Sequence, residues 1–208
     1  MTENETTRQT EQPLQDWRLN GASSREARGI VDTMLDQMDV SPSYQRGDVW
    51  SMDQRIALVK SWLMGVPIPA LILNNRDNPE WAATEGPVYG DGVHAETFQP
   101  IWALVDGKQR LETARLWFAG ALAVPASWFD PEWIKYPCVT EDGLYVTHEG
   151  LTLAARRHIG HRFAFPVIEA KLPSLRAEAE LYLLVNGGGT AQTEADMSNA
   201  ARVAAEGK

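Results

Sequence analysis

The chain is poor in cysteine, in long apolar runs and in basic residues. Its 208 residues contain a single cysteine, Cys138, which cannot form an intramolecular disulfide, so a reducing compartment is expected. No run approaches the roughly 20 apolar residues that a bilayer-spanning helix needs. The polar N-terminus also lacks the apolar stretch of a secretory signal. These absences predict a cytoplasmic protein with no membrane partner.

The charge balance is acidic, with 28 Asp and Glu residues against 19 Lys and Arg and a formal net charge of -9. Proteins that grip nucleic-acid phosphates over a broad surface normally carry a basic footprint. The composition therefore disfavours tight, nonspecific binding to duplex DNA. DNA contact stays open as a partner interaction, without a strong basic footprint to support it.

Local patterns predict a flexible polar N-terminal tail over residues 1–27 and one domain over residues 28–208. Apolar residues recur at helical spacing in several segments, and short apolar runs bounded by Pro, Gly or Asn indicate strands between them. This interleaving predicts an α+β or α/β fold with a small mixed sheet. The expected helices lie near residues 30–38, 52–63, 108–120, 151–159, 173–184 and from 193, with strands at 70–73, 101–105 and 163–170. A long linker over residues 74–100 is expected to contain a hairpin or form a lid.

The strongest chemical signal is an expected strand that leads through Asp106-Gly107 directly into a helix. Unsatisfied N–H groups at a helix N-terminus attract anions, and Gly107 lets the backbone approach a phosphate closely. Lys108 and Arg110 add positive charge, while Asp106 could hold Mg²⁺ or accept a proton. The alternative is an ordinary Asp-Gly turn followed by solvated basic side chains, because the G-x-x-x-x-G-K-[ST] phosphate loop is absent.

Two further segments could carry binding chemistry. Residues 41–50 combine a Pro turn with Gln45 and Arg46, and Tyr44 and Trp50 could anchor the segment; the alternative is a surface loop held by aromatic side chains. Residues 186–190 contain three consecutive glycines, whose N–H groups could form an anion-binding concavity or simply end a helix. A zinc site at His158 and His161 is disfavoured, because no further ligand lies at a recognisable spacing.

Four blocks of sequence occur in a specific order along the chain. They are Tyr44-Gln45-Arg46 with Val49-Trp50, Ile68-Pro69, Asp106-Gly107-Lys108-Gln109-Arg110-Leu111, and Asn186-x-Gly188-Gly189-Thr190. Together they resemble the DGQQR-motif family, which forms the N-terminal domain of GmrSD-type restriction proteins within the ParB/sulfiredoxin superfamily. The resemblance spans roughly residues 28–203, and Gly107 to Ala114 also reads G-x-x-R-x-x-A, similar to the phosphate-contacting motif of ParB proteins.

The resemblance implies a ParB/sulfiredoxin-like fold and a site that binds or hydrolyses a nucleoside triphosphate, ATP or GTP with the base undetermined, together with Mg²⁺. By position, Asp106 would serve the metal or activate water, and Arg110 would act with it in catalysis. The implied nucleotide-binding residues are Gln45, Arg46, Gly107, Lys108, Gln109, Asn186 and Gly188.

The chain departs from the family pattern at three places. Lys108 replaces the first Gln of DGQQR, and the segment at Tyr182, Leu184 and Asn186 lacks the arginine of the family's Phe-x-Arg-x-Asn. Restriction proteins of this type continue into an HNH nuclease domain, whereas this sequence ends at Lys208 without one. A separate nuclease or DNA-modification enzyme is therefore an expected partner.

The favoured interpretation is Mg²⁺-dependent phosphoryl transfer, principally NTP hydrolysis, in a DNA-modification, restriction or phage-host conflict system of a bacterial or phage-infected cytoplasm. One alternative is a kinase that passes phosphate to a nucleoside, a modified DNA base or another small acceptor. A second alternative is a non-catalytic, nucleotide-gated binding module or a subunit that recruits a separate nuclease. A nuclease is disfavoured, because the chain lacks an HNH signature and a basic face.

Overall fold

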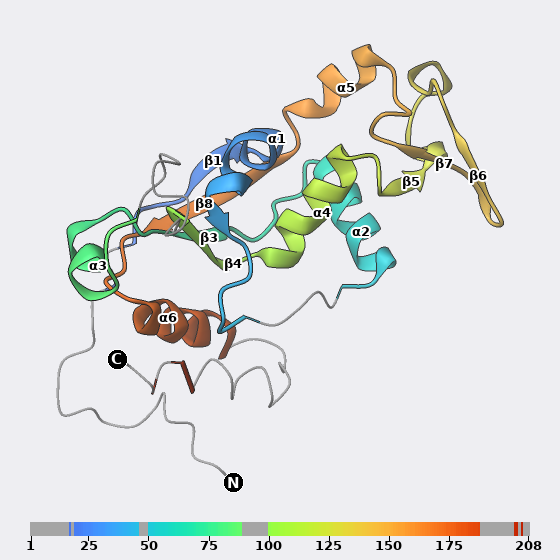
Figure 1. Ribbon diagram of the computed structural model, residues 1–208. Helices are drawn as coiled ribbons and strands as arrows, with labels where there is room; N and C mark the ends of the chain where they lie inside the picture. The colour runs from blue at the N-terminus through green and yellow to red at the C-terminus, as the bar shows by residue number, and fades with distance from the viewer. Residues whose placement is uncertain are drawn as a thin grey trace, which may run out of the picture.

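A five-stranded mixed sheet lies at the centre of the protein in the computed structural model, which describes residues 17, 19–45, 50–88, 100–187, 202, 203 and 205 (Figure 1). The strand order is β1-β8-β3-β4-β2. The inner strand β3 runs antiparallel to β4 and parallel to β8, while β2 lies parallel to β4 and β1 antiparallel to β8. The strands are β1 (Ser23–Glu26), β2 (Met38–Asp39), β3 (Leu71–Asn75), β4 (Trp102–Asp106) and β8 (Ala164–Ala170).

Side-chain alternation along the strands divides the core between the two faces of this sheet. In β4, Leu104 packs into one buried cluster and its neighbour Val105 into the other. β3 behaves in the same way, with Leu71 on the first side and Ile72 on the second. β3 and β4 are therefore buried on both faces.

Helices α1, α2 and α4 contribute to the first cluster and α6 covers the second (Figure 1). Short π and 3-10 turns at Ile30–Met34 and Leu35–Gln37 connect α1 to β2. No helix within the described ranges is long and apolar enough to cross a membrane. The helices are α1 (Ala27–Gly29), α2 (Met52–Leu63), α3 (Pro79–Thr84), α4 (Lys108–Phe118), α5 (Leu153–Gly160) and α6 (Leu175–Gly187).

A second, three-stranded antiparallel sheet lies at the far end of the molecule, beyond the C-terminal end of α4 (Figure 1). Its order is β5-β7-β6, and its strands are β5 (Ala123–Pro125), β6 (Cys138–Thr140) and β7 (Gly143–Thr147). The sequence did not predict it, because the strands are short and carry exposed apolar residues such as Val139 and Leu144 instead of a clean alternation.

The predicted α+β class is confirmed by these helices and two sheets. Three details differ. Met38, expected at the end of a helix, lies in β2, and the described part of the 74–100 linker contains α3 instead of a hairpin. Residues 23–26, placed at the end of the expected tail, form β1 and pair with β8. The helix expected from Thr193 begins outside the described residues.

The buried stripe of α2 is also shifted relative to the expected one. The spacing of Met52, Ile56, Val59 and Leu63 predicts the inward face of this helix. Val59 is buried as predicted, but Met52 is 54% exposed. The residues that are buried are Arg55, Leu58, Val59 and Trp62. The guanidinium of Arg55 reaches α4, where Nη1 donates to Thr113 Oγ1 at 3.2 Å. A prediction based only on the spacing of apolar residues does not identify a buried arginine that hydrogen-bonds to another helix.

Candidate functional site

The predicted strand, turn and helix around Asp106 are present. β4 ends at Asp106 and α4 begins at Lys108, with Gly107 alone between them at φ +105°. This left-handed conformation is available to glycine at little cost. A Cβ at Gly107 would also overlap Leu71 Cδ2 and lie 3.1 Å from Arg110 Nη2. Both the turn and the close approach of β3 therefore require glycine here.

The N-terminus of α4 has no side-chain cap and no acidic residue in its first turn. The first backbone N–H groups of a helix have no intrahelical acceptor, and the helix dipole adds positive potential at this end. Ser51 of α2, by contrast, caps its own helix by accepting from Gln54 N at 3.3 Å. The uncapped end of α4 is thus suited to an anionic ligand.

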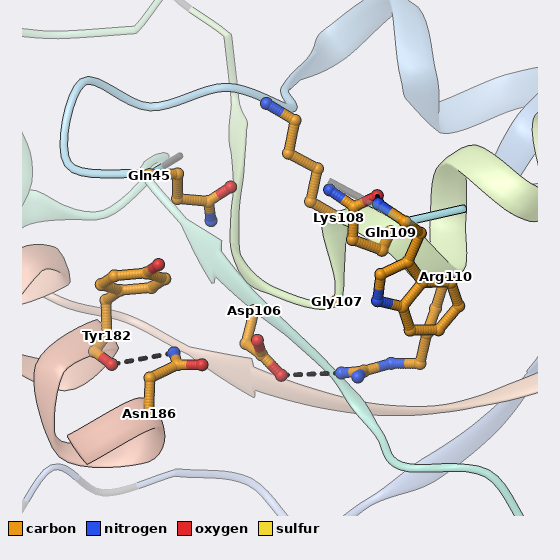
Figure 2. A pocket seen from close by; sticks show the side chains of 9 residues that line it. Gln45, Asp106, Gly107, Lys108, Gln109, Arg110, Tyr182 and Asn186 are labelled. Atoms are coloured by element: carbon orange, nitrogen blue, oxygen red, sulfur yellow. Dashed lines mark hydrogen bonds and ion pairs between the residues drawn. The ribbon is translucent and has the colours of Figure 1, made fainter. Parts of the chain in front are cut away.

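A cleft of about 140 Å³ opens at this end of α4. Figure 2 shows Gln45, Tyr182 and Asn186 on one side of it and the first residues of α4 on the other, with Asp106 between them. Segments separated by more than 130 positions thus meet at one cleft. Its lining consists of Gln45, Trp50, Asp106, Gly107, Lys108, Gln109, Arg110, Tyr182 and Asn186.

Asp106 and Arg110 are bound to each other within this cleft. Arg110 Nη2 donates to Asp106 Oδ2 at 2.7 Å and to the Ala70 carbonyl at 2.9 Å (Figure 2). Both side chains are largely buried, at 14% and 23% exposure for Arg110 and Asp106. Arg110 Nε is buried without a partner among the described residues. The ion pair fixes the guanidinium at the cleft and leaves part of its donor capacity unused.

Gln45 extends the edge of β4 beyond the point where β2 ends. β2 pairs with β4 only as far as Ala103, and Gln45 Nε2 donates to the next two carbonyls, those of Leu104 and Val105, the latter at 2.8 Å. Its Oε1 is buried and has no partner in the described part of the chain. Gln45 Oε1 and Arg110 Nε are therefore two unpaired polar atoms on residues that line one cleft. Buried polar atoms without a protein partner are usually hydrogen-bonded by a ligand or by ordered water.

Lys108 and Gln109 have their side chains engaged within the protein. Lys108 Nζ donates to Ser41 Oγ at 2.6 Å, which ties α4 to the loop after β2. Gln109 Oε1 accepts from Trp50 N at 3.4 Å and from Arg55 Nη2 at 3.5 Å. In this arrangement Gln109 positions the start of α2 against α4, a role that its place in the motif did not indicate.

The α6 wall of the cleft is made by Tyr182 and Asn186, and Asn186 Nδ2 donates to the Tyr182 carbonyl at 2.9 Å. α6 continues through Gly187, so Asn186 lies in its last turn and not in a connecting loop. The expected anion-binding concavity over residues 186–190 lies mostly outside the described residues. So do Arg46 and Gly188, two of the predicted nucleotide-binding residues.

A buried ionic cluster beneath this wall was not predicted. Glu178 of α6 is fully buried and accepts four hydrogen bonds. The donors are Tyr44 OH at 3.2 Å, Asn74 Nδ2 at 2.7 Å, Arg76 Nε at 2.9 Å and Arg76 Nη2 at 2.7 Å. Arg76 also pairs with Asp39 at 3.3 Å. The cluster joins α6 to the sheet and to Tyr44, the residue next to Gln45.

The cluster also sets the protonation states of its members. Burial, followed by the charge of Glu178, raises the pKa of Tyr44 well above its ordinary value, so the phenol remains a neutral donor. Burial alone would lower the pKa of Arg76, but its hydrogen bonds to Glu178 and the charge of that carboxylate outweigh burial and raise the pKa. No sequence signal marks the cluster, since Glu178 lies 102 positions from Arg76 and 134 from Tyr44.

The donor set of the cleft suits a metal that is also held by phosphate oxygens. Among the described residues, Asp106 is the one carboxylate that lines it, and no group of three His, Cys, Asp or Glu side chains there could hold a metal by itself. Mg²⁺ is commonly held by one or two carboxylates together with substrate phosphates. Asp106 therefore suits Mg²⁺ carried by phosphates, and it does not form a free-standing metal centre. His158 and His161, with ring centroids 6.4 Å apart, likewise have no third ligand of this kind among the described residues.

The comparison with family models gives one match relevant to this cleft. Residues 29–186, about three quarters of the chain, match the N-terminal domain of the GmrSD restriction endonucleases. No curated protein and no solved structure matches the chain significantly. The matched range includes Gln45, the whole Asp106–Arg110 segment and Asn186, and it indicates a restriction-system context. The chain belongs to the family of GmrSD restriction endonuclease N-terminal domains.

Proposed function

We propose that the cleft at the start of α4 binds the phosphates of a nucleoside triphosphate with Mg²⁺ and transfers the terminal phosphoryl group to water, within a restriction system. The observation that carries this proposal is the uncapped N-terminus of α4, which begins directly after Asp106-Gly107 and opens into a cleft with Arg110 on its wall. Backbone donors, an arginine and a carboxylate at one place are the elements that phosphoryl transfer uses.

Each residue has a distinct role in this proposal. The N–H groups of Lys108, Gln109 and Arg110 would bind phosphate oxygens, and Gly107 lets the phosphate reach them. The guanidinium of Arg110, already fixed by Asp106 and the Ala70 carbonyl, would donate to the phosphates through its remaining N–H groups.

Asp106 would serve at the reacting end of the nucleotide. Its Oδ2 is bound to Arg110, and its Oδ1 accepts no hydrogen bond within the described ranges. Oδ1 would hold Mg²⁺ or accept the proton of the attacking water. When bound, Mg²⁺ supplies charge neutralisation on the phosphate oxygens. Gln45 and Asn186 would bind the nucleotide from the opposite wall.

A second candidate, nucleotide binding without turnover, is favoured by the Asp106–Arg110 ion pair. At 2.7 Å this pair occupies one oxygen of the carboxylate that hydrolysis would use. If the pair persists in the complex, Asp106 orients Arg110 and does not activate water. The protein would then act as a nucleotide-gated module for a separate nuclease or DNA-modification enzyme. Transfer of the phosphoryl group to a nucleoside or base acceptor is a third outcome, and the same experiment distinguishes it from hydrolysis and from binding without turnover.

The test measures binding and turnover with one set of variants. Calorimetry with Mg·ATP and Mg·GTP gives the Kd, and release of γ-labelled phosphate gives turnover. We expect Arg110→Ala to weaken binding at least about tenfold, because a charge-assisted bidentate donor is lost. Asp106→Asn should keep binding within about threefold and reduce turnover at least about a hundredfold.

Arg115→Ala is the matched control, since Arg115 lies on the same helix but is half exposed and pairs with Glu112 at 2.7 Å. It should leave both measurements unchanged. The proposal fails if no nucleoside triphosphate binds, or if Arg110→Ala binds as well as Arg115→Ala. Binding without turnover in the wild type supports the second candidate, and label on an acceptor supports the kinase.

A further inference from the structure

A second cleft, at the opposite end of α4, concentrates the positive charge of this acidic protein. It has a volume of about 360 Å³ and is lined by Arg28 of α1, Phe118 at the end of α4, and Arg156 and Arg157 of α5. α4 has 11 residues, so at 1.5 Å per residue about 16 Å separates the two sites along its axis. The second cleft, which we call the arginine cleft, is therefore distinct from the nucleotide site.

The sequence around α5 is basic over a long stretch. Residues 150–168 contain three arginines and two histidines and no aspartate or glutamate, although the whole chain carries a net charge of -9. Within the described part of the chain, Glu26 is the single acidic residue lining the cleft, and Arg28 is paired with Asp32 in an exposed ion pair at 3.0 Å. The remaining charge of the arginine cleft is not neutralised by these two carboxylates.

Arg156 and Arg157 lack the partners that arginines in a structural network have. Neither guanidinium forms a hydrogen bond or ion pair with any described residue, and Arg156 Nε is buried without an acceptor. Elsewhere in the fold, Arg76 and Arg110 are bound by carboxylates and carbonyls. A buried, unpaired guanidinium nitrogen is costly, which favours an acceptor supplied by a ligand.

The electrostatic effect of these arginines is visible on His148, which also lines the cleft. Burial, together with the charges of Arg28 and Arg156, lowers the pKa of His148 to about 4. The imidazole is therefore neutral near pH 7, and its ring packs edge-on against Phe118 at 5.2 Å between centroids. This wall of the cleft is thus formed by packed aromatic rings, and the positive potential of the cleft comes from arginine.

We propose that the arginine cleft is a contact site for the phosphodiester backbone of DNA. Guanidinium groups match phosphate geometry through paired N–H donors. The exposed side chains of Arg157 and His161 continue the cleft onto the surface, as an extended polyanion requires and a single small anion does not. This contact would lie away from the nucleotide cleft and does not depend on the function proposed for it.

The test measures the affinity for a fluorescent 20-base-pair duplex by anisotropy at several salt concentrations, without nucleotide. The Arg156→Ala/Arg157→Ala variant removes two phosphate contacts, so its slope of log K against log salt should be shallower by about 1.8. Between about 50 and about 200 mM salt, wild type should lose about twelvefold more affinity than the variant. Arg157→Glu, at an exposed position, tests the same contact where folding is not at risk.

The matched control is Arg115→Ala/Arg176→Ala, which removes the same charge from two exposed arginines paired with Glu112 and Glu180. It should retain the wild-type slope. The proposal is overturned if both double variants behave alike, if the duplex does not bind at low salt, or if inorganic triphosphate or poly-glutamate displaces DNA at equal charge concentration. If calorimetry shows no nucleotide binding at the cleft of α4, the outcome of this DNA-binding experiment is unaffected.

Discussion

Removing the buried carboxylate of Glu178 is expected to destabilise the protein strongly. Glu178→Ala leaves Arg76, whose side chain is 7% exposed, with the more distant Asp39 as its remaining carboxylate partner. It also removes the acceptor of Tyr44 OH and Asn74 Nδ2. The perturbation thus converts a satisfied buried cluster into a buried cation and two unpaired donors.

The expected magnitude follows from these contacts. Breaking a buried ion pair by removing one partner costs about 3–5 kcal/mol. Total stabilities are typically about 5–15 kcal/mol, so the loss is a large fraction. For a chain of this size each kcal/mol shifts Tm by about 2–4 °C, which predicts a decrease of about 6–20 °C.

Urea unfolding monitored by circular dichroism measures this loss, with Glu180→Ala as the control. Glu180 lies on the same helix but pairs with the exposed Arg176 at 2.9 Å, so its removal should cost less than about 1 kcal/mol. Combining Arg76→Met with Glu178→Leu should recover stability relative to Glu178→Leu alone, because no uncompensated cation remains. Equal losses for Glu178→Ala and Glu180→Ala, or no recovery in the double variant, would refute the reasoning.

Three other predictions concern single positions. Gly107→Ala should cost roughly 2–5 kcal/mol in urea unfolding, because a positive φ and overlap with Leu71 are combined; a loss below about 0.5 kcal/mol would contradict the geometry. Ser51→Ala should cost about 1 kcal/mol by removing the α2 capping box with Gln54, and Ser51→Asn should retain most of that stability. Because the pKa of His148 is lowered in the folded protein, the unfolded chain takes up the proton first as the pH falls. The stability that neutral, buried His148 contributes is therefore fully present above about pH 6.5 and is lost as the pH falls towards 4. This contributes roughly 1–2 kcal/mol, allowing for solvent screening, and the stability difference between wild type and His148→Gln should vary with pH in that window.

The local part of the candidate site was predictable from sequence because strand, turn and helix are consecutive. A short apolar run ending in Asp106-Gly107, followed by helical spacing from Leu111, specifies a helix N-terminus at the end of a strand. The burial of Tyr44, at 1% exposure, also agrees with its predicted role as an anchor.

The long-range part of the site was not predictable. The bonds of Gln45 to the carbonyls of β4 and of Glu178 to Arg76 join residues 59 to 102 positions apart, and local periodicity carries no information on such pairs. The same holds for Arg55, a charged residue on the buried face of α2 that is satisfied by Thr113 of α4. The resemblance to a family brought Gln45 and Asn186 into the hypothesis, and the fold places both at one cleft.

The positive charges of this acidic chain are not evenly distributed in the fold. A net charge of -9 describes the whole chain, whereas Arg28, Arg156 and Arg157 gather at one cleft and Lys108 and Arg110 line another. Overall charge still disfavours a protein that coats DNA. It is compatible with two small positive sites at opposite ends of one helix.

The most direct test of the central claim is a crystal structure with a non-hydrolysable triphosphate analogue and Mg²⁺. We expect phosphate oxygens within about 3 Å of the N–H groups at Lys108–Arg110, with Arg110 donating to them and Mg²⁺ bound by Asp106. Phosphates bound elsewhere, or a nucleotide complex in which the first turn of α4 makes no phosphate contact, would contradict it.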